Sequence, residues 1–189
     1  MFSSIEEVND QIVDNRWVEW DHLGLPNSPK EYRNIVRGVL ALLGHCMKCT
    51  ALDGCYLVER NMPTYPLHPN CDCEKIAIDS ALVKQKAKAE CPIEKFTEYV
   101  FTDIDKSKGK LAIYQSFGFS KEDSAKLKVE LEQQCLKNYL KGNYVLKDLD
   151  KNGQRLAIPT VLADKPFYTG WILEPEGTIR NTTPFGGWM

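Results

Sequence analysis

The feature that most constrains the fold of this chain is a dense group of cysteines in one short segment. Of the seven cysteines in 189 residues, five lie between positions 46 and 73. Four of them form a C-x-x-C pair and a later C-x-C pair. Each pair can direct two thiolates to one side of a tight bend, and four thiolates complete the tetrahedron that zinc prefers, with Zn–S bonds of about 2.3 Å. The sequence therefore predicts one zinc ion held by Cys46, Cys49, Cys71 and Cys73.

The spacing leaves the choice of ligands open. His68 could replace Cys71 or Cys73, because the turn at Pro69-Asn70 brings it close to both. A site closed by four protein ligands is structural, whereas a catalytic zinc needs an open position and a nearby general base. The zinc-deaminase pattern places a glutamate close after its histidine, but Pro69 follows His68 here. We therefore interpret the zinc as structural.

The fifth cysteine of the segment, Cys55, is a weaker ligand candidate. It follows the turn signal Asp53-Gly54 and could simply pack near the metal. The alternative for the whole group is a set of small buried hydrophobic side chains, since unpaired cysteine is frequently buried. The density of cysteines between 46 and 73 favours metal binding over packing alone.

Charge and hydropathy argue against two classes of protein. The 24 basic and 26 acidic side chains leave a formal net charge of −2, so the positive coat of a nucleic-acid-binding protein is absent and direct nucleic-acid binding is not expected. No segment approaches the run of about 20 apolar residues that a membrane helix needs. The acidic start MFSSIEEVND does not resemble a signal peptide. We expect a protein of the reducing cytoplasm, where clustered cysteines are more often metal ligands than disulfides.

The order of sequence patterns predicts an α+β protein in two parts. Residues 1–91 form a helical zinc-knuckle module with the metal-binding loop at 43–75. Trp17 and Trp20 lie on an extended segment of this part. Capping and breaker signals predict its helices at residues 4–15, 28–43 and 78–90.

The second part, residues 92–189, is expected to be a two-helix plus four-stranded antiparallel meander domain. Helices are predicted at 110–117 and 121–140. The pattern then changes to a period of two residues, and turn signals at 150–153 and 174–177 separate the expected strands. These strands carry the sequences NYVLKDL, QRLAIPTVL, FYTGWIL and GTIRNTT.

The cysteine motif resembles the C-terminal zinc-binding tail of phage Mu F-like minor head proteins. It runs C-x-x-C-x-x-L-D-G from Cys46 and H-P-N-C-x-C from His68. The resemblance covers about residues 43–75. It implies a phage or prophage origin and a zinc ion bound in this segment.

Short pieces of residues 95–188 resemble small domains found downstream of such tails and in polymorphic toxins. Those domains are thought to share the barnase/EndoU/colicin/RelE nuclease fold. The pieces are Lys95-Phe96-x-x-Tyr99, Gly109-Lys110-x-Ala112, Phe117-Gly118-Phe119, Gly153-x-Arg155, Trp171-x-x-x-Pro175, Gly177 and Thr183-Pro184. No histidine follows His68 to act as a general base. A nuclease of this kind would therefore have to use lysine and arginine chemistry, with Lys108, Lys110, Arg155 and Thr183 as its candidates.

Three functions follow from these patterns, and enzymatic activity is the less favoured reading. The first is a phage-derived structural-zinc protein that binds a host protein, most concretely an anti-CRISPR inhibitor that blocks target DNA loading by a type II CRISPR effector nuclease. The second is a metal-independent ribonuclease toxin domain. The third is a minor virion component. For the first, acidic side chains of the helix at 121–140 are candidate contacts, namely Glu122, Asp123, Glu130 and Glu132.

Overall fold

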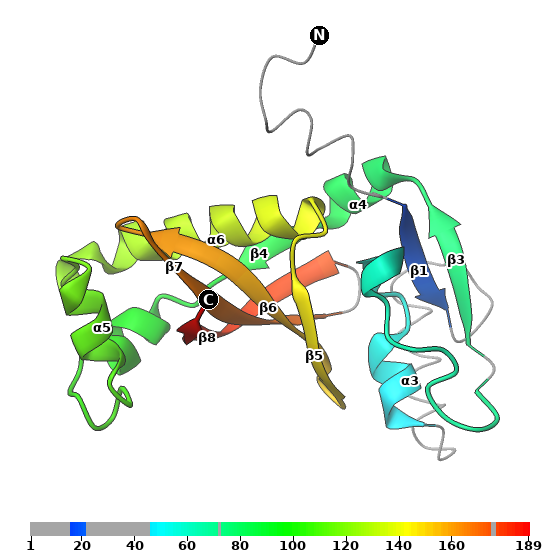
Figure 1. Ribbon diagram of the computed structural model, residues 1–189, viewed down its shortest axis with the longest axis horizontal. Coiled ribbons are helices and arrows are strands. Elements are labelled where there is room, and N and C mark those ends of the chain that lie inside the picture. The colour runs from blue at the N-terminus through cyan, green and yellow to red at the C-terminus, as the bar shows by residue number, and fades with distance from the viewer. Residues whose placement is uncertain (1–15, 22–45, 72, 175–176) are drawn as a thin grey trace, which may run out of the picture.

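The computed structural model describes residues 16–21, 46–71, 73–174 and 177–189, and these form an α+β fold with two sheets. The helices expected at 4–15 and 28–43 lie outside the described residues. The smaller sheet has the strand order β2-β1-β3, and the larger one has the order β4-β8-β7-β6-β5 (Figure 1). Within the described ranges, no helix has both the length and the hydropathy of a membrane span.

The smaller sheet is built around β1 (Trp17–Asp21), which is buried at every position. It pairs antiparallel with β2 (Tyr56–Val58) and with β3 (Glu74–Ile78). The predicted extended segment at Trp17 and Trp20 is thus confirmed as a central strand. The helix α3 (Met47–Leu52) precedes β2, and the 3-10 turn η1 (Glu59–Asn61) follows it.

The larger sheet contains the expected meander. Strands β5 (Val145–Asp150), β6 (Gly153–Leu162), β7 (Lys165–Leu173) and β8 (Thr178–Trp188) pair antiparallel in sequence order. A two-residue turn joins β6 to β7. Ala163 and Asp164 both have positive φ there, as a type I′ hairpin turn requires.

A fifth strand corrects two details of the sequence interpretation. Residues 78–90 were expected to form one helix, but the helix α4 spans only Ser80–Lys86, and β4 (Lys88–Glu90) pairs parallel with β8. The sheet is therefore mixed and five-stranded. The residues of β4 favour helix by intrinsic propensity, so the pairing with the edge of β8 decides their conformation.

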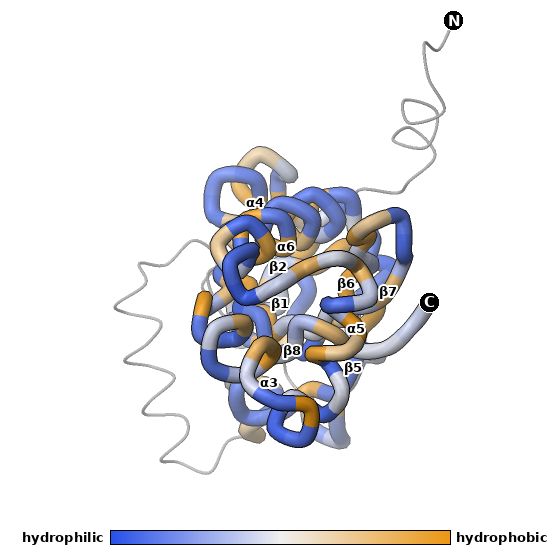
Figure 2. The backbone as a smooth tube through the Cα atoms, turned by 90° about the vertical axis from the view of Figure 1, so that its left-hand side faces the viewer, coloured by the Kyte–Doolittle hydropathy of each residue, from blue (hydrophilic) through white to orange (hydrophobic). Residues whose placement is uncertain are grey.

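The helix α6 (Ser124–Leu140) runs along one face of the larger sheet, and α5 (Lys110–Ser116) lies at one end of the sheet (Figure 1). Both confirm predicted helices, and the 3-10 turn η3 (Lys121–Asp123) precedes α6. A one-turn π-helix, η2 (Lys95–Val100), lies before α5. The buried stripe of α6 has helical spacing and consists of Leu127, Leu131, Cys135 and Tyr139. Figure 2 shows hydrophilic residues on the outer turns of α6 and apolar ones beneath it.

The two halves of the chain share one hydrophobic core. The ring of Trp17 in β1 contacts that of Tyr139 in α6, with centroids 5.2 Å apart. The Tyr139 hydroxyl donates to the Tyr56 carbonyl, and the Val58 amide donates to the Tyr144 hydroxyl at 2.8 Å. The segment 46–73, which contains the clustered cysteines, therefore packs where α6 is followed by β5. The predicted boundary between two domains, at residues 91 and 92, stays a prediction.

Candidate metal centre

The first two candidate ligands come from α3. Cys46 is the residue before the helix, and Cys49 lies in its first turn, so both thiols lie on neighbouring positions of one face. Thr50 stabilises this turn, because its amide and its hydroxyl both donate to the Cys46 carbonyl. The helix ends where the backbone of Gly54 takes a positive φ of 75°.

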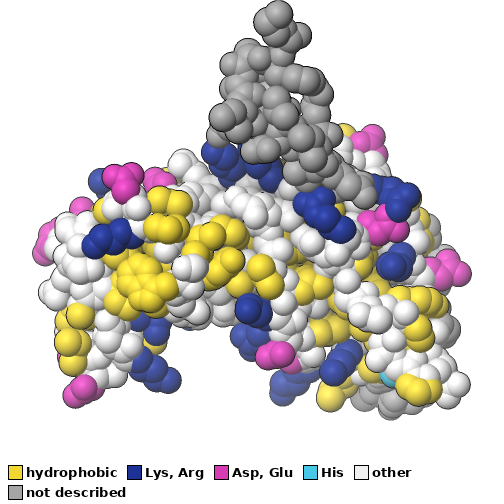
Figure 3. Space-filling view, in the orientation of Figure 1, with side chains coloured by type: hydrophobic (Ala, Val, Ile, Leu, Met, Phe, Trp, Pro, Cys, Tyr) yellow, Lys and Arg dark blue, Asp and Glu magenta, His cyan; other side chains and the backbone are white. Residues whose placement is uncertain are grey.

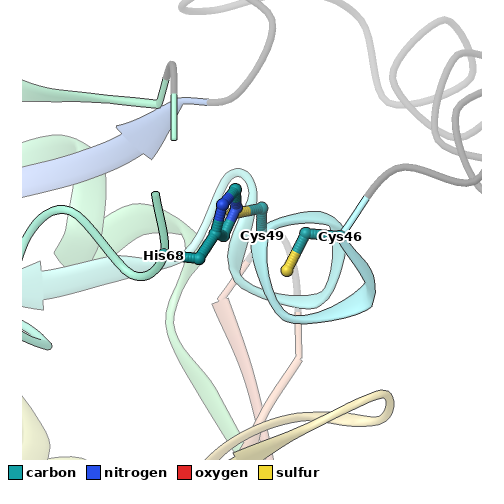
Figure 4. Close-up of side chains that lie close together, drawn as sticks. All are labelled: Cys46, Cys49 and His68. Atoms are coloured by element: carbon teal, nitrogen blue, oxygen red, sulfur yellow. The ribbon is translucent and has the colours of Figure 1, made fainter. Parts of the chain in front are cut away.

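His68 lies in the loop after η1 and faces the same helix (Figure 4). Its Nε2 atom is 3.2 Å from Cys49 Sγ, and its Nδ1 atom is 2.7 Å from the carbonyl oxygen of Pro69. A carbonyl oxygen can only accept, so Nδ1 carries the proton and the lone pair of Nε2 is directed at the thiol. A metal-binding histidine typically has this arrangement, because the second nitrogen donates to a backbone carbonyl.

Cys71 and Cys73 complete the group from the residues just before β3. Cys49 Sγ lies 3.8 Å from Cys71 Sγ. Ligands about 2.3 Å from a tetrahedral zinc ion are separated by about 3.8 Å, so this pair already has the spacing of bound ligands. The donor atoms form two groups of three that share Cys49, and within each group all atoms lie within 4.8 Å of one another. The groups are Cys46, Cys49 and His68, and Cys49, Cys71 and Cys73.

The structure thus brings all four predicted cysteines and the alternative ligand His68 to one place. A single tetrahedral ion needs four of these five donors. His68 lies in one group with Cys46 and Cys49, so these three donors can bind the same ion, and its replacement of Cys71 or Cys73 stays a prediction. Cys55 belongs to neither group. It is buried in the core, with its thiol 3.8 Å from the Ala51 carbonyl.

Two thiols of this group, those of Cys49 and Cys73, resist ionisation when no cation is bound. Burial, followed by the neighbouring Cys73, raises the pKa of Cys49 well above its usual range. Burial likewise raises the pKa of Cys73 to about 12. Burial also acts to raise the pKa of Cys71. Hydrogen bonds with the backbone of Cys73 and of Leu67 outweigh it, so the pKa of Cys71 is lowered. A bound divalent cation would reverse the balance, because it stabilises the thiolates that coordinate it.

Trp20 is a residue of this centre that sequence patterns did not single out as functional. It is fully buried, and its Nε1–H group has no hydrogen-bond partner with good geometry among the described residues. The indole nevertheless lies close enough to Cys73 to lower the pKa of that thiol. A metal-bound thiolate at Cys73 is a better acceptor than a thiol and would take up this donor. Trp20 comes close to Cys73 because β1 pairs with β3, so local sequence patterns do not show this contact.

Three of the four nuclease candidates form side-chain hydrogen bonds with other residues, and none of these bonds joins two candidates. Arg155 Nε donates to Asp150 at 3.0 Å, and Thr183 donates to the carbonyl of Phe185. Lys108 is exposed in the loop before α5, at a positive φ of 52°. Lys110 donates to the Tyr99 hydroxyl.

Of the acidic side chains expected to contact a partner, three have roles in the fold. Asp123 closes a capping box with Ser120. Glu132 accepts from the amide of Cys91 and pairs with Lys128, and Glu130 accepts from Gln134. Glu122 is exposed.

Comparison with known proteins yields no relative for this chain. No protein-family model, no curated protein and no solved structure matches it. The resemblances to phage head-protein tails and to nuclease-like domains therefore rest on their short motifs. What the structure adds is a cluster of cysteine and histidine side chains that could bind a metal such as zinc.

Proposed function

We propose that the protein is a structural-zinc protein of phage or prophage origin that acts by binding another protein. The observation that supports the zinc ion is that four other sulfur and nitrogen donors lie around the thiol of Cys49. Soft thiolates and imidazole are the ligands that select zinc, and a site closed by four of them leaves no position for a substrate.

The zinc ion would fix the position of the segment that contains α3. The segment contacts β5 and β6, and the residues after β2 reach the end of α6, where Asn61 Nδ2 donates to the Gly142 carbonyl at 2.7 Å. Short segments with little core of their own are commonly held in place by a metal. The metal centre would thus hold the surface of this segment in the conformation that a partner protein binds.

The concrete version of this proposal is an anti-CRISPR inhibitor of a type II effector nuclease that blocks target DNA loading. Its support is the phage-like cysteine motif, together with a second half that has no histidine to act as a general base. The choice of target follows from the inferred phage origin.

An effector assay tests the target directly. Purified zinc-loaded protein is added to a guide-loaded type II nuclease before or after target DNA, and both DNA binding and cleavage are measured. Inhibition only when the protein is added first supports the proposal. If effectors of the type II subtypes are neither inhibited nor bound on size-exclusion chromatography, the proposed target is wrong. The zinc assignment is unaffected by that result.

The ribonuclease alternative has its own measurement. Incubation of the purified zinc-loaded protein with tRNA and mRNA, in buffer without added magnesium or chelator, should leave both intact. Degradation that is abolished by Arg155→Ala or Lys110→Ala would contradict the non-enzymatic proposal. Detection of the protein in purified virions by mass spectrometry would favour a minor virion component.

A further inference from the structure

The metal centre has one donor more than a tetrahedral ion uses. Its donors are Cys46, Cys49, His68, Cys71 and Cys73, whereas zinc in a closed site takes four ligands. Cys49 is the donor that the two groups of three share, so without its thiol each group keeps two donors. Retention of the ion therefore depends more on Cys49 than on the other donors.

The thiol of Cys49 is in contact with the thiol of Cys71. The two sulfur atoms are 3.8 Å apart, although 22 residues separate them in the sequence. The backbone turn that follows His68 holds Cys71 in this position, because the Cys71 amide donates to the His68 carbonyl at 3.2 Å. A disulfide bond is about 2.05 Å long, so the two sulfur atoms would have to approach each other by about 1.8 Å. Changes of side-chain dihedral angles can supply an approach of this size.

Cys71 is also the member of this pair that an oxidant in solution can reach. It is partly exposed, whereas Cys49 and Cys73 are fully buried. Figure 3 shows a histidine side chain at the surface at the end of the molecule where α3 lies, so solvent reaches the edge of the centre. Redox-sensitive cysteines typically combine an accessible thiol with a second thiol beside it that completes a disulfide.

We propose that oxidation of Cys49 and Cys71 to a disulfide releases the metal ion, with a hydroperoxide as the oxidant. This redox control rests on the zinc centre proposed above. The disulfide would withdraw the donor common to both groups, together with Cys71. Three donors would remain, namely Cys46, His68 and Cys73, and these are fewer than a closed zinc site needs.

The reaction consumes one hydroperoxide molecule per disulfide. The Cys71 thiolate attacks the terminal peroxide oxygen, the O–O bond breaks, and the alkoxide takes a proton and leaves as an alcohol, so that Cys71 becomes a sulfenic acid. The Cys49 thiolate then attacks the Cys71 sulfur. The S–S bond forms, and the S–O bond breaks as hydroxide leaves and is protonated to water. The two sulfur atoms supply both electrons that reduce the peroxide, zinc leaves as the divalent ion, and a dithiol reductant reverses the change.

Release of the ion would free only part of the segment. The disulfide would keep α3 attached to the residues before β3, but Cys46 and His68 would lose the ion that joins them. The side chain of Tyr65, which is exposed, lies in the loop that His68 anchors. A partner that binds this loop would therefore bind the reduced, zinc-loaded protein and not the oxidised one.

The first measurement follows zinc release in the presence of a chromophoric chelator. Reduced, zinc-loaded protein is titrated with hydrogen peroxide, the simplest hydroperoxide, and free thiols are counted in parallel. We expect about one zinc ion released for every two thiols lost, and renewed zinc uptake after treatment with dithiothreitol. If the reduced protein contains no zinc, the proposed zinc centre is wrong. If zinc is present and peroxide does not release it, only the redox control is wrong.

Two matched variants separate the disulfide from general oxidative damage. Cys71→Ser keeps four donors, so it should bind zinc, and it should lose the release by peroxide because Cys49 no longer has its sulfur contact. The control is Cys55→Ser, which lies outside both groups and whose hydroxyl can keep the bond to the Ala51 carbonyl. It should release zinc as the wild type does, and circular dichroism melting shows whether both variants are folded. Release from zinc-loaded Cys71→Ser at the wild-type rate overturns the proposal.

Peptide mapping identifies the disulfide in the oxidised wild type without any variant. Trypsin cleaves after lysine and arginine, so Cys49 falls in peptide 49–60 and Cys71 in peptide 61–75. The expected disulfide links these two peptides, and fragmentation of the linked pair should place the bond at Cys49 and Cys71. A bond within peptide 61–75, or one that links peptide 49–60 to peptide 38–48, contradicts the proposal.

Discussion

Cys49 Sγ and His68 Nε2 lie 3.2 Å apart, and this contact joins α3 to a loop 19 residues further along the chain. The hydrogen bond between His68 Nδ1 and the Pro69 carbonyl fixes which nitrogen faces the thiol. The separation is close to that of two ligands of one zinc ion. The imidazole is therefore already oriented for coordination.

The first prediction is that His68→Ala weakens zinc binding by more than the factor of about 10–100 that loss of an outer partner costs. The physical reason is that the variant removes a donor already directed at the metal position. Competition with a chromophoric chelator measures the affinity, and Cys46→Ala is the matched comparison from the same group. If His68→Ala binds zinc as the wild type does while Cys46→Ala does not, the four thiolates are the ligand set.

The second prediction separates ligand cysteines from core cysteines. Elemental analysis should give about one zinc per chain for the wild type and for Cys135→Ala, and much less for Cys49→Ala, which removes the atom common to both donor groups. Cys135 is fully buried in α6, so its truncation should lower the free energy of unfolding by about 1 kcal/mol without metal loss. A folded, metal-free wild type would contradict the zinc assignment.

The third prediction concerns alkaline pH and Cys91. Burial, followed by the charge of Glu132, raises the pKa of this thiol to about 12 from its ordinary value of 9.0. A raised native pKa means that the stabilisation is complete below pH 9.0 and is lost as the pH rises from 9.0 towards 12. Urea unfolding of the wild type and of Cys91→Ala should show a stability difference that is constant near neutrality and shrinks above about pH 9. A difference that stays constant up to pH 11 would mean that the thiol titrates normally.

The fourth prediction concerns the docking of the cysteine segment on the second half. Tyr139→Phe removes the fully buried hydroxyl that donates to the Tyr56 carbonyl. Its loss should lower the free energy of unfolding by about 1–3 kcal/mol, because the carbonyl loses a donor in a buried site. Chemical denaturation measures the effect, and limited proteolysis should show faster cleavage near residues 56–61. Tyr168→Phe, at a half-buried position of β7, should change neither quantity.

The local patterns of the sequence predicted the elements that have a strong periodic signal. The buried stripe from Leu127 to Tyr139 has helical spacing, and it is the inner face of α6. The turn signals around Asn152 and Gly153 predicted the first hairpin of the meander, because only a few residue types adopt such turns without strain. The C-x-x-C and C-x-C pairs likewise predicted a metal site, since few other functions need thiols at that density.

Tertiary contacts decided the rest. Residues 88–90 have the composition of a helix, and they are a strand because the edge of β8 offers them a parallel partner. The proximity of His68 to Cys46, of Trp20 to Cys73 and of Lys110 to Tyr99 depends on chain segments that meet only in the folded state. Sequence spacing alone could identify the donors of the metal centre. Which donors face each other depends on the register of strands and the direction of side chains, and these are set by packing around one shared core.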